Sequence, residues 1–261
     1  MQLAAARYSY YNRSCVLFNI VNFFIIPERS LRRVAVFYDG FNFYYGLKDL
    51  KAETGTCLYW QDLQMLSESI IENLADYIPD HKLEKVVYFT ADIKSSDARK
   101  RWRQQNYFKL IEAFGHLVVR GDYQIKNVRC PSCDEEPVKC QNCSYEMEVP
   151  REKQTDVNIA LYSLIGAYQD RYDDLVIVTS DSDQAPVAKQ IARWFTNDPK
   201  RVYFAFPPCQ VQNKALMATC SGWCRISEFM LESCLLPRIV ITPEGKKISC
   251  PREWLEGGAV R

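Results

Sequence analysis

Two groups of polar side chains follow apolar runs of strand length in this chain. Asp39 and Asn42 come just after the run Val34–Tyr38. Asp181 and Asp183 follow a second run of the same kind. In an open parallel sheet, ligands bind beyond the carboxyl ends of the strands, so these side chains fall where a binding site is expected. Neighbouring carboxylates repel one another unless a cation joins them, and such hard oxygen ligands suit Mg²⁺ or Mn²⁺.

Some of these acids also have a purely structural explanation. Asp183 precedes Pro186, a residue that fits the first turn of a helix, so a helix cap is the alternative role for Asp183. Asp181 has no such alternative, because it stands two residues past a strand that we expect to be buried on both faces. Asp156 falls at the predicted start of a helix, where an acid favours the helix dipole and where Thr155 or Asp156 itself is expected to act as the cap. Asp156 gains weight as a metal ligand only because the other acids exist.

The composition excludes several other kinds of site. The chain has only two histidines, which argues against a histidine-dependent catalytic triad and against a metal site built from several histidines. It has 10 glycines in 261 residues and no G-x-G-x-x-G or G-x-x-x-x-G-K motif, which argues against a glycine-rich nucleotide-binding loop. The 33 basic and 32 acidic residues leave a net charge of +1, so any binding of a polyanion must come from local clustering.

The elements that must position these residues alternate along the chain. Five runs rich in Val, Ile, Phe and Tyr predict strands at Val34–Tyr38, Lys85–Thr90, Leu117–Arg120, Leu175–Thr179 and Val202–Phe206. Apolar residues recur at helical spacing in 63–74, 157–168 and 187–194. Strands that alternate with helices indicate an α/β fold with a parallel sheet covered on both faces. The segment 120–151 interrupts the alternation, and we expect it to be an insert.

Four segments together resemble a known family. They are Arg33–Tyr44, Val86–Thr90, Glu152–Ala160 and Arg171–Asp183. In this order they resemble the NYN family of PIN-like domains, and within it the LabA-type branch, over roughly residues 31–207. The resemblance implies a three-layer fold with a five-stranded parallel sheet of strand order 3-2-1-4-5. Because the first and fourth strands are then neighbours, it also implies that Asp39 and Asp181 face each other.

The resemblance further implies metal-dependent cleavage of RNA. The ligands of the metal would be Asp39, Asp156, Asp181 and Asp183, with Asn42 as a polar assistant. Hydrolysis of a phosphodiester needs a hydroxide nucleophile and stabilisation of charge on phosphorus, and bound divalent ions supply both. We expect Asp39 and Asp181 to hold the principal metal, with Asp183 and Asp156 in a second or water-mediated shell.

A second kind of metal site is predicted within the insert. Two C-x2-C pairs supply the four thiolates of a tetrahedral, structural Zn²⁺ site, namely Cys130, Cys133, Cys140 and Cys143. Two disulfides are the alternative, but they would need an oxidising compartment, whereas the zinc interpretation places the chain in the cytoplasm. We therefore predict a small zinc-binding insert over 126–150, which either staples the insertion or grips the substrate.

The densest basic and aromatic cluster is Arg99–Lys109. It holds the side chains predicted to contact nucleic acid, Arg99, Arg101 and Arg103. On a helix, Arg99 and Arg103, followed by Asn106 or Tyr107, are about one turn apart. They would follow successive phosphates while Trp102 or Tyr107 stacks on a base. A solvated helix face is the alternative. Lys153 is assigned to a phosphate oxygen, with an exposed lysine of no role as its alternative.

The two ends of the chain differ from the middle. Residues 1–30 contain the apolar run Cys15–Ile26, which at 12 residues is too short to span a bilayer as a helix, so we expect no membrane partner. A poorly structured extension is the preferred interpretation of 1–30. A signal peptide is the alternative, although no A-x-A-like cleavage site follows. In 208–261 the pattern predicts a helix around Ser227–Cys234 and then a polar tail.

These features favour a metal-dependent endoribonuclease with RNA as its partner. The second interpretation is a catalytically silent NYN module that binds RNA or scaffolds a regulatory complex. The third takes Asp181 and Asp183 as a phosphatase or primase-like acid pair. Phosphatases of that sort place the pair after their first strand, and the primase-like pattern requires glutamate at the position of Asp39. The sequence leaves open which RNA is cut and whether the chain forms a homo-oligomer.

Overall fold

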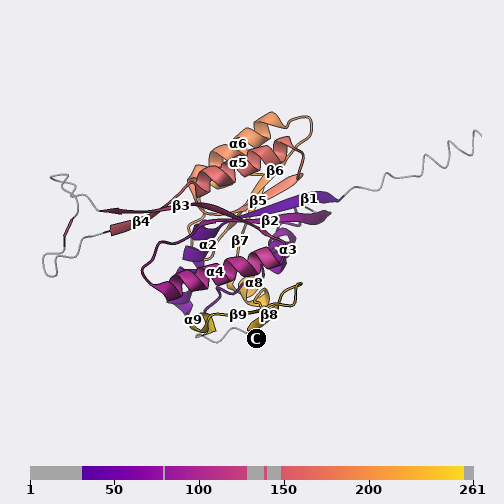
Figure 1. Cartoon of the computed structure of the whole chain (residues 1–261). Coiled ribbons are helices and arrows are strands. Elements are labelled where there is room, and N and C mark those ends of the chain that lie inside the picture. The colour runs from indigo at the N-terminus through magenta and orange to yellow at the C-terminus, as the bar shows by residue number, and fades with distance from the viewer. Residues whose placement is uncertain (1–30, 79, 128–137, 140–147, 256–261) are drawn as a thin grey trace, which may run out of the picture. The chain divides into compact units, whose positions relative to one another are not determined.

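The structure is a computed structural model that describes residues 31–78, 80–127, 138–139 and 148–255 (Figure 1). The strands are β1 Arg32–Asp39, β2 His81–Ala91, β3 Leu117–Asn127, β4 Glu148–Lys153, β5 Asp174–Val178, β6 Arg201–Phe206, β7 Gly222–Arg225, β8 Ile239–Ile241 and β9 Lys247–Ser249. The helices are α2 Gly40–Thr54, α3 Leu63–Asn73, α4 Ala98–Ala113, α5 Thr155–Tyr168, α6 Ala185–Trp194, α7 Lys214–Met217, α8 Glu228–Ser233 and α9 Arg252–Leu255, with the 3-10 turn η1 at Ser182–Gln184. Within these ranges, no helix is long and apolar enough to cross a membrane.

The main sheet has the strand order β4-β3-β2-β1-β5-β6-β7. Strands β3, β2, β1, β5 and β6 are parallel and stand in the order expected for the five predicted strands. The expectation of five parallel strands was nevertheless wrong, because β7 pairs in parallel with β6 and makes a sixth. β7 has only four residues, and its burial alternates, so it gives no apolar run in the sequence. Strand β4 is antiparallel to β3.

Alternate residues of β1 divide the core into two layers. Val34, Val36 and Tyr38 belong to one buried cluster, and Ala35 and Phe37 belong to another. This alternation follows from the two-residue repeat of a strand, which points successive side chains to opposite faces. Helices α2, α3 and α4 cover the first face, and α5 and α6 cover the second (Figure 1). The predicted α/β architecture with both faces covered is confirmed.

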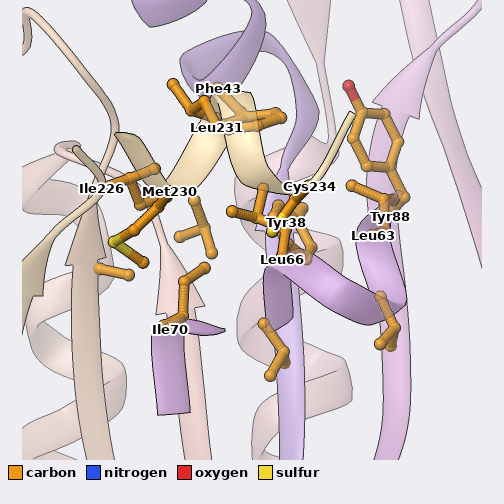
Figure 2. Close-up of a cluster of buried hydrophobic side chains, with 14 of the residues drawn as sticks. Tyr38, Phe43, Leu63, Leu66, Ile70, Tyr88, Ile226, Met230, Leu231 and Cys234 are labelled. Atoms are coloured by element: carbon orange, nitrogen blue, oxygen red, sulfur yellow. The ribbon is translucent and has the colours of Figure 1, made fainter. Parts of the chain in front are cut away.

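The segment after β7 completes the first core cluster. Figure 2 shows Met230, Leu231 and Cys234 beside Leu66 of α3 and Tyr38 of β1, all of them buried. Two hydrogen bonds join the same segment to the loop before α3. The indole Nε1–H of Trp60 donates to the carbonyl of residue 237 at 3.0 Å, and the amide of residue 236 donates to the Trp60 carbonyl at 3.0 Å. Residues 228–241 are therefore part of the packed domain.

An ion-pair network joins the amino ends of the strands. We call it the amino-end network, and it consists of Arg32, Arg33, Asp170, Asp173, Asp174, Lys200 and Arg201. Asp174 is fully buried, and its Oδ1 accepts from the Arg32 guanidinium at 2.9 Å and from Arg201 Nε at 3.0 Å. These bonds link the amino ends of β1, β5 and β6. They therefore hold these three strands in register at the end of the sheet opposite its carboxyl edge.

Candidate active site

Asp39 is the last residue of β1 and also the N-cap of α2. Its Oδ1 accepts a hydrogen bond from the Asn42 amide at 3.1 Å, and its Oδ2 accepts from Thr179 Oγ1 at 3.0 Å. The side chain is nearly buried, with a residue exposure of 5%. Hydrogen bonds at both oxygens fix the orientation of this carboxylate between the first and fourth predicted strands.

Gly40 is needed at the start of α2 because the helix begins close to β2. A Cβ atom placed on Gly40 would lie 2.5 Å from Tyr88 Cε1 and 2.6 Å from the carbonyl oxygen of Phe89. The Tyr88 hydroxyl also donates to the Gly40 carbonyl at 3.2 Å. The absence of a side chain lets α2 leave the sheet directly after Asp39.

The loop after β5 is tied to the same place. Asn42 Oδ1 accepts from the Ser180 amide at 2.9 Å, and the Asp181 amide donates to Thr179 Oγ1 at 3.0 Å. Asp181 itself caps η1, because its Oδ1 accepts from the Asp183 amide at 3.0 Å. The structure thus gives the capping role to Asp181, where the sequence suggested Asp183. The reason is that a 3-10 turn precedes α6, so the chain begins to coil earlier than Pro186 indicates.

Asp156 enters from α5 on the other face of the sheet. The structural alternative made Thr155 or Asp156 the cap of this helix, but neither residue caps it. The N-cap is Gln154, which has a φ of 76° and makes no side-chain capping bond. Gln184 is buried, and its Nε2 donates to the carboxylate and to the carbonyl of Asp156, at 3.4 Å each. This contact places Asp156 next to η1, the turn that Asp181 caps.

These side chains meet around one open cavity of about 380 Å³ at the carboxyl edge of the sheet. Its lining comprises Asp39, Phe41, Asn42, Tyr45, Asp49, Asp156, Asp181 and Gln210. Four of the five candidates for catalysis are therefore brought together. Asp183 is exposed and is not part of the lining.

The sequence reasoning missed two polar residues of the cavity. Asp49 lies two helical turns beyond Asn42 on α2, so the spacing i to i+7 would have placed both on one face. Gln210 belongs to the loop after β6 and donates through Nε2 to Asp49 Oδ2 at 3.0 Å. No motif marks Gln210 in the sequence, because only the fold brings that loop over α2.

The acidic residues of the cavity are spread over its walls. Among the residues that the structure describes, no three or more His, Cys, Asp or Glu side chains gather closely enough to hold a metal ion between them. Mg²⁺ usually keeps several of its waters and takes only one or two protein carboxylates. The oxygen donors of Asp39, Asn42 and Asp181 therefore fit an ion that is held by one or two carboxylates and several waters. They do not fit an ion whose ligands all come from the protein.

The predicted zinc ligands Cys130, Cys133, Cys140 and Cys143 lie outside the described residues. Among the described thiols, those of Cys57, Cys224, Cys234 and Cys250 are buried. Desolvation raises the pKa of Cys224 and of Cys250 to about 12. Both therefore stay protonated at neutral pH and act as small apolar side chains.

Helix α4 is less open to nucleic acid than its sequence suggests. The C-terminal segment packs along it: Arg103 pairs with Glu253 at 2.9 Å, and Asn106 Nδ2 donates to the backbone carbonyl of residue 249 at 2.9 Å. Tyr107 is buried, so it cannot stack on a base as predicted. Arg99, Arg101 and Trp102 are exposed at the start of the helix, and Lys153 is exposed at the end of β4.

Comparison with known proteins shows the family to which this chain belongs. The profile of the NYN domain matches residues 33–222, so the chain belongs to the NYN domain family. NYN domains are generally nucleases that act on RNA, which agrees with an acidic cavity at the carboxyl edge of a parallel sheet.

Two individual proteins are also similar. One is 6-hydroxy-3-succinoylpyridine 3-monooxygenase HspA of Pseudomonas putida (strain DSM 28022 / S16), which is 29% identical over 245 residues that cover 85% of this chain and 75% of HspA. The other is the crystal structure of VPA0982, a protein of unknown function from Vibrio parahaemolyticus RIMD 2210633. That structure has 15% identity and a TM-score of 0.48, and the match covers 81% of this chain and all of VPA0982.

Proposed function

We propose that this protein is a metal-dependent ribonuclease that hydrolyses phosphodiester bonds in the acidic cavity. The observation that carries the proposal is the convergence of Asp39, Asp156 and Asp181, from three different elements, on one solvent-accessible cavity in an NYN domain. Carboxylates this concentrated favour a divalent cation, and a phosphodiester could approach them only with such an ion present.

In this proposal, some residues of the cavity bind the metal ion and others position those ligands. Asp39 and Asp181 would hold Mg²⁺ or Mn²⁺, which when bound supplies a hydroxide nucleophile and neutralises charge on the phosphate. Asn42 holds the loop after β5 against α2 and so keeps Asp181 near Asp39. Asp156, held by Gln184, is assigned to a water-mediated shell. We keep Asp183 in such an outer shell, because it stands outside the cavity lining.

The direct test is cleavage of a labelled single-stranded RNA with Mg²⁺ or Mn²⁺. We expect Asp181→Asn to lower the rate by at least about 100-fold, because loss of a metal ligand exceeds the effect of losing a group that merely orients one. The matched control is Asp76→Asn, which changes an exposed acid before β2, at the amino end of the strands. Equal cleavage by the wild type and Asp181→Asn would refute the site, and binding without cleavage by the wild type would favour the catalytically silent module.

The similarity to HspA supports a second candidate, an aromatic monooxygenase. It extends over most of this chain, and Phe41 and Tyr45 offer flat surfaces beside the cavity for an aromatic ring. The negative charge of the cavity opposes this candidate, because a succinoyl group carries a carboxylate at neutral pH. Oxygen uptake that depends on 6-hydroxy-3-succinoylpyridine and a reduced nicotinamide or flavin, with no action on RNA, would establish it in place of the nuclease.

We also propose that the two C-x2-C pairs hold one structural Zn²⁺ and that the protein works in the reducing cytoplasm. Four thiolates at this spacing form a closed tetrahedral site. Elemental analysis should find about one zinc per chain, and Cys130→Ser should lose it. Protein without zinc, with the same cysteines joined as disulfides, would overturn both statements.

A further inference from the structure

The exposed side of α2 carries aromatic and basic side chains that begin at the acidic cavity. We call this surface the α2 strip, and its members are Phe41, Tyr44, Tyr45, Lys48 and Lys51. Their positions repeat every three or four residues, so they lie on one side of the helix. Tyr44 is 42% exposed and Tyr45 is 51% exposed, although both are large aromatic residues. Phe41 and Tyr45 also line the cavity, which makes the α2 strip continuous with the candidate active site.

Ring contacts extend the strip in both directions. Phe41 stacks on Tyr123 of β3, with centroids 6.2 Å apart and planes 25° apart. Tyr44 stacks on Tyr59, with centroids 5.4 Å apart and planes 24° apart, and it meets Tyr45 edge to face at 5.7 Å. These contacts hold the rings in place before any ligand arrives, so little side-chain entropy remains to be lost on binding.

Two lysines of α2 lie over aromatic rings of this surface. Lys48 Nζ lies 5.7 Å from the Tyr45 centroid, and Lys51 Nζ lies 5.9 Å from the Tyr59 centroid. The acids Asp49 and Glu53 are one helical turn apart and form their own row, where they accept from the side chains of Gln210 and Cys209. The α2 strip therefore carries the two lysines of the helix, whereas the two acids that balance their charge lie outside the strip.

We infer that the α2 strip binds single-stranded RNA and leads it into the acidic cavity. Aromatic rings with lysines close to them suit unpaired bases joined by phosphates. Every base has a face that can stack, whereas the bases of a duplex are already stacked on one another. The inference rests on the proposed function in so far as it takes RNA as the ligand, and it adds that the RNA is unpaired and that α2, in preference to α4, holds it.

The test is the affinity of a labelled 12-nucleotide single-stranded RNA, measured by fluorescence anisotropy with Ca²⁺ in place of Mg²⁺. We expect Tyr44→Ala and Tyr45→Ala each to weaken binding about tenfold, the range for loss of one stacked base. Tyr44→Phe and Tyr45→Phe keep the ring and should bind as the wild type does. The control is Tyr168→Ala, which removes an 84% exposed tyrosine from α5 on the other face of the sheet and should have no effect.

The lysines have their own readout. Lys48→Gln and Lys51→Gln should each reduce the slope of log affinity against log salt by about 0.7, the value for one phosphate contact on a single strand. Lys189→Gln on α6 is the matched control, because Lys189 is exposed on the helix layer that covers the opposite face. An unchanged slope in both α2 variants would contradict the inference.

Other outcomes separate this inference from the proposed function. Wild-type affinity in both alanine variants, equal weakening by Tyr168→Ala, tighter binding of duplex RNA, or tighter binding of single-stranded DNA would each overturn the inference. If the alanine variants bind weakly but the wild type cuts no RNA with Mg²⁺ or Mn²⁺, the α2 strip stands and the nuclease proposal fails. If RNA is cut at equal rates by wild type and variants, the nuclease stands and the α2 strip fails.

Discussion

The two ends of the central strands hold aspartates in opposite ways. At the amino ends, Asp174 accepts from two arginines, and Asp173 pairs with Arg33 and Lys200. At the carboxyl ends, Asp39 accepts from a backbone amide and a threonine hydroxyl. A carboxylate neutralised by a cation of the protein stabilises the fold. The amide and the hydroxyl orient the carboxylate of Asp39 at the cavity, so the stabilising ion pairs and the candidate site lie at opposite edges of one sheet.

The strongest test of this contrast is Asp39→Asn at the carboxyl edge. Asparagine caps helices about as well as aspartate, so we expect the free energy of unfolding to change by less than about 1 kcal/mol. Cleavage of RNA should fall by at least about 100-fold, because the amide has lost the charge that attracts a divalent ion. Parallel activity assays and urea denaturation measure both effects. A large loss of stability with little loss of activity would make Asp39 a structural residue like Asp174.

At the amino edge we expect the reverse from Asp174→Asn. Removal of one partner from a buried ion pair lowers the free energy of unfolding by about 3–5 kcal/mol. Because Arg32 and Arg201 are partly exposed, we expect a loss of about 3 kcal/mol. Activity per folded molecule should remain, because the network lies at the far end of the strands. Urea denaturation followed by activity assays at low temperature checks this. A variant that is stable but inactive would break the comparison.

Close packing also constrains the backbone at the carboxyl edge, and Gly40→Ala tests this constraint. The added methyl group would meet Tyr88 and the backbone of residue 89 at under 3.0 Å, so α2 or β2 must shift. Overpacking of this kind costs about 1–3 kcal/mol. Because Asp39 is the adjacent residue, activity should fall as well. Gly55→Ala is a useful contrast, since no atom lies within 4 Å of the added carbon and the cost there comes from the left-handed φ of 79°. If neither stability nor activity changes in Gly40→Ala, packing at this point does not position the site.

The smallest effect that we expect is a pH dependence from Asp173. Desolvation raises the pKa of this carboxyl, but the hydrogen bonds and charge of Arg33 outweigh it and hold the pKa well below 3.8. The folded state therefore favours the ionised form. This contribution to stability is present above the unfolded pKa near 4 and is lost as the pH falls toward the folded value. Melting temperatures between pH 6 and 2 should fall less steeply in Asp173→Asn than in the wild type, and identical slopes would exclude the linkage.

The sequence predicted the central sheet well because most of its strands are buried on both faces. Such strands give unbroken apolar runs, and each of the five runs became a strand of the sheet. β7 was missed because it is short and alternates between buried and exposed residues. The structure does not give Asp183 or Asp156 the capping role that we weighed as the alternative for each. A 3-10 turn and a left-handed Gln154 start those helices in ways that residue preferences do not encode.

The sequence predicted only some of the residues that line the cavity, for a similar reason. Asp39, Asn42 and Asp181 follow strands, and that position alone marks them. Gln210 comes from a loop whose course depends on the packing of β6 and β7. The covering of α4 by the C-terminal segment, with Arg103 paired to Glu253, also joins residues 150 positions apart. Contacts at such separation leave no local pattern.

By itself, the sequence determined the α/β class, the neighbouring carboxylates after the first and fourth strands and the resemblance to the NYN family. Periodicity and turn chemistry are local, so they can be read along the chain. Tertiary structure decided which surfaces remain open. It covered the middle of α4, at Arg103 and Asn106, with the C-terminal segment. It left the tyrosines of α2 exposed beside the cavity and brought Gln210 onto Asp49. Which side chains meet solvent depends on packing between distant segments, and only the folded chain fixes that.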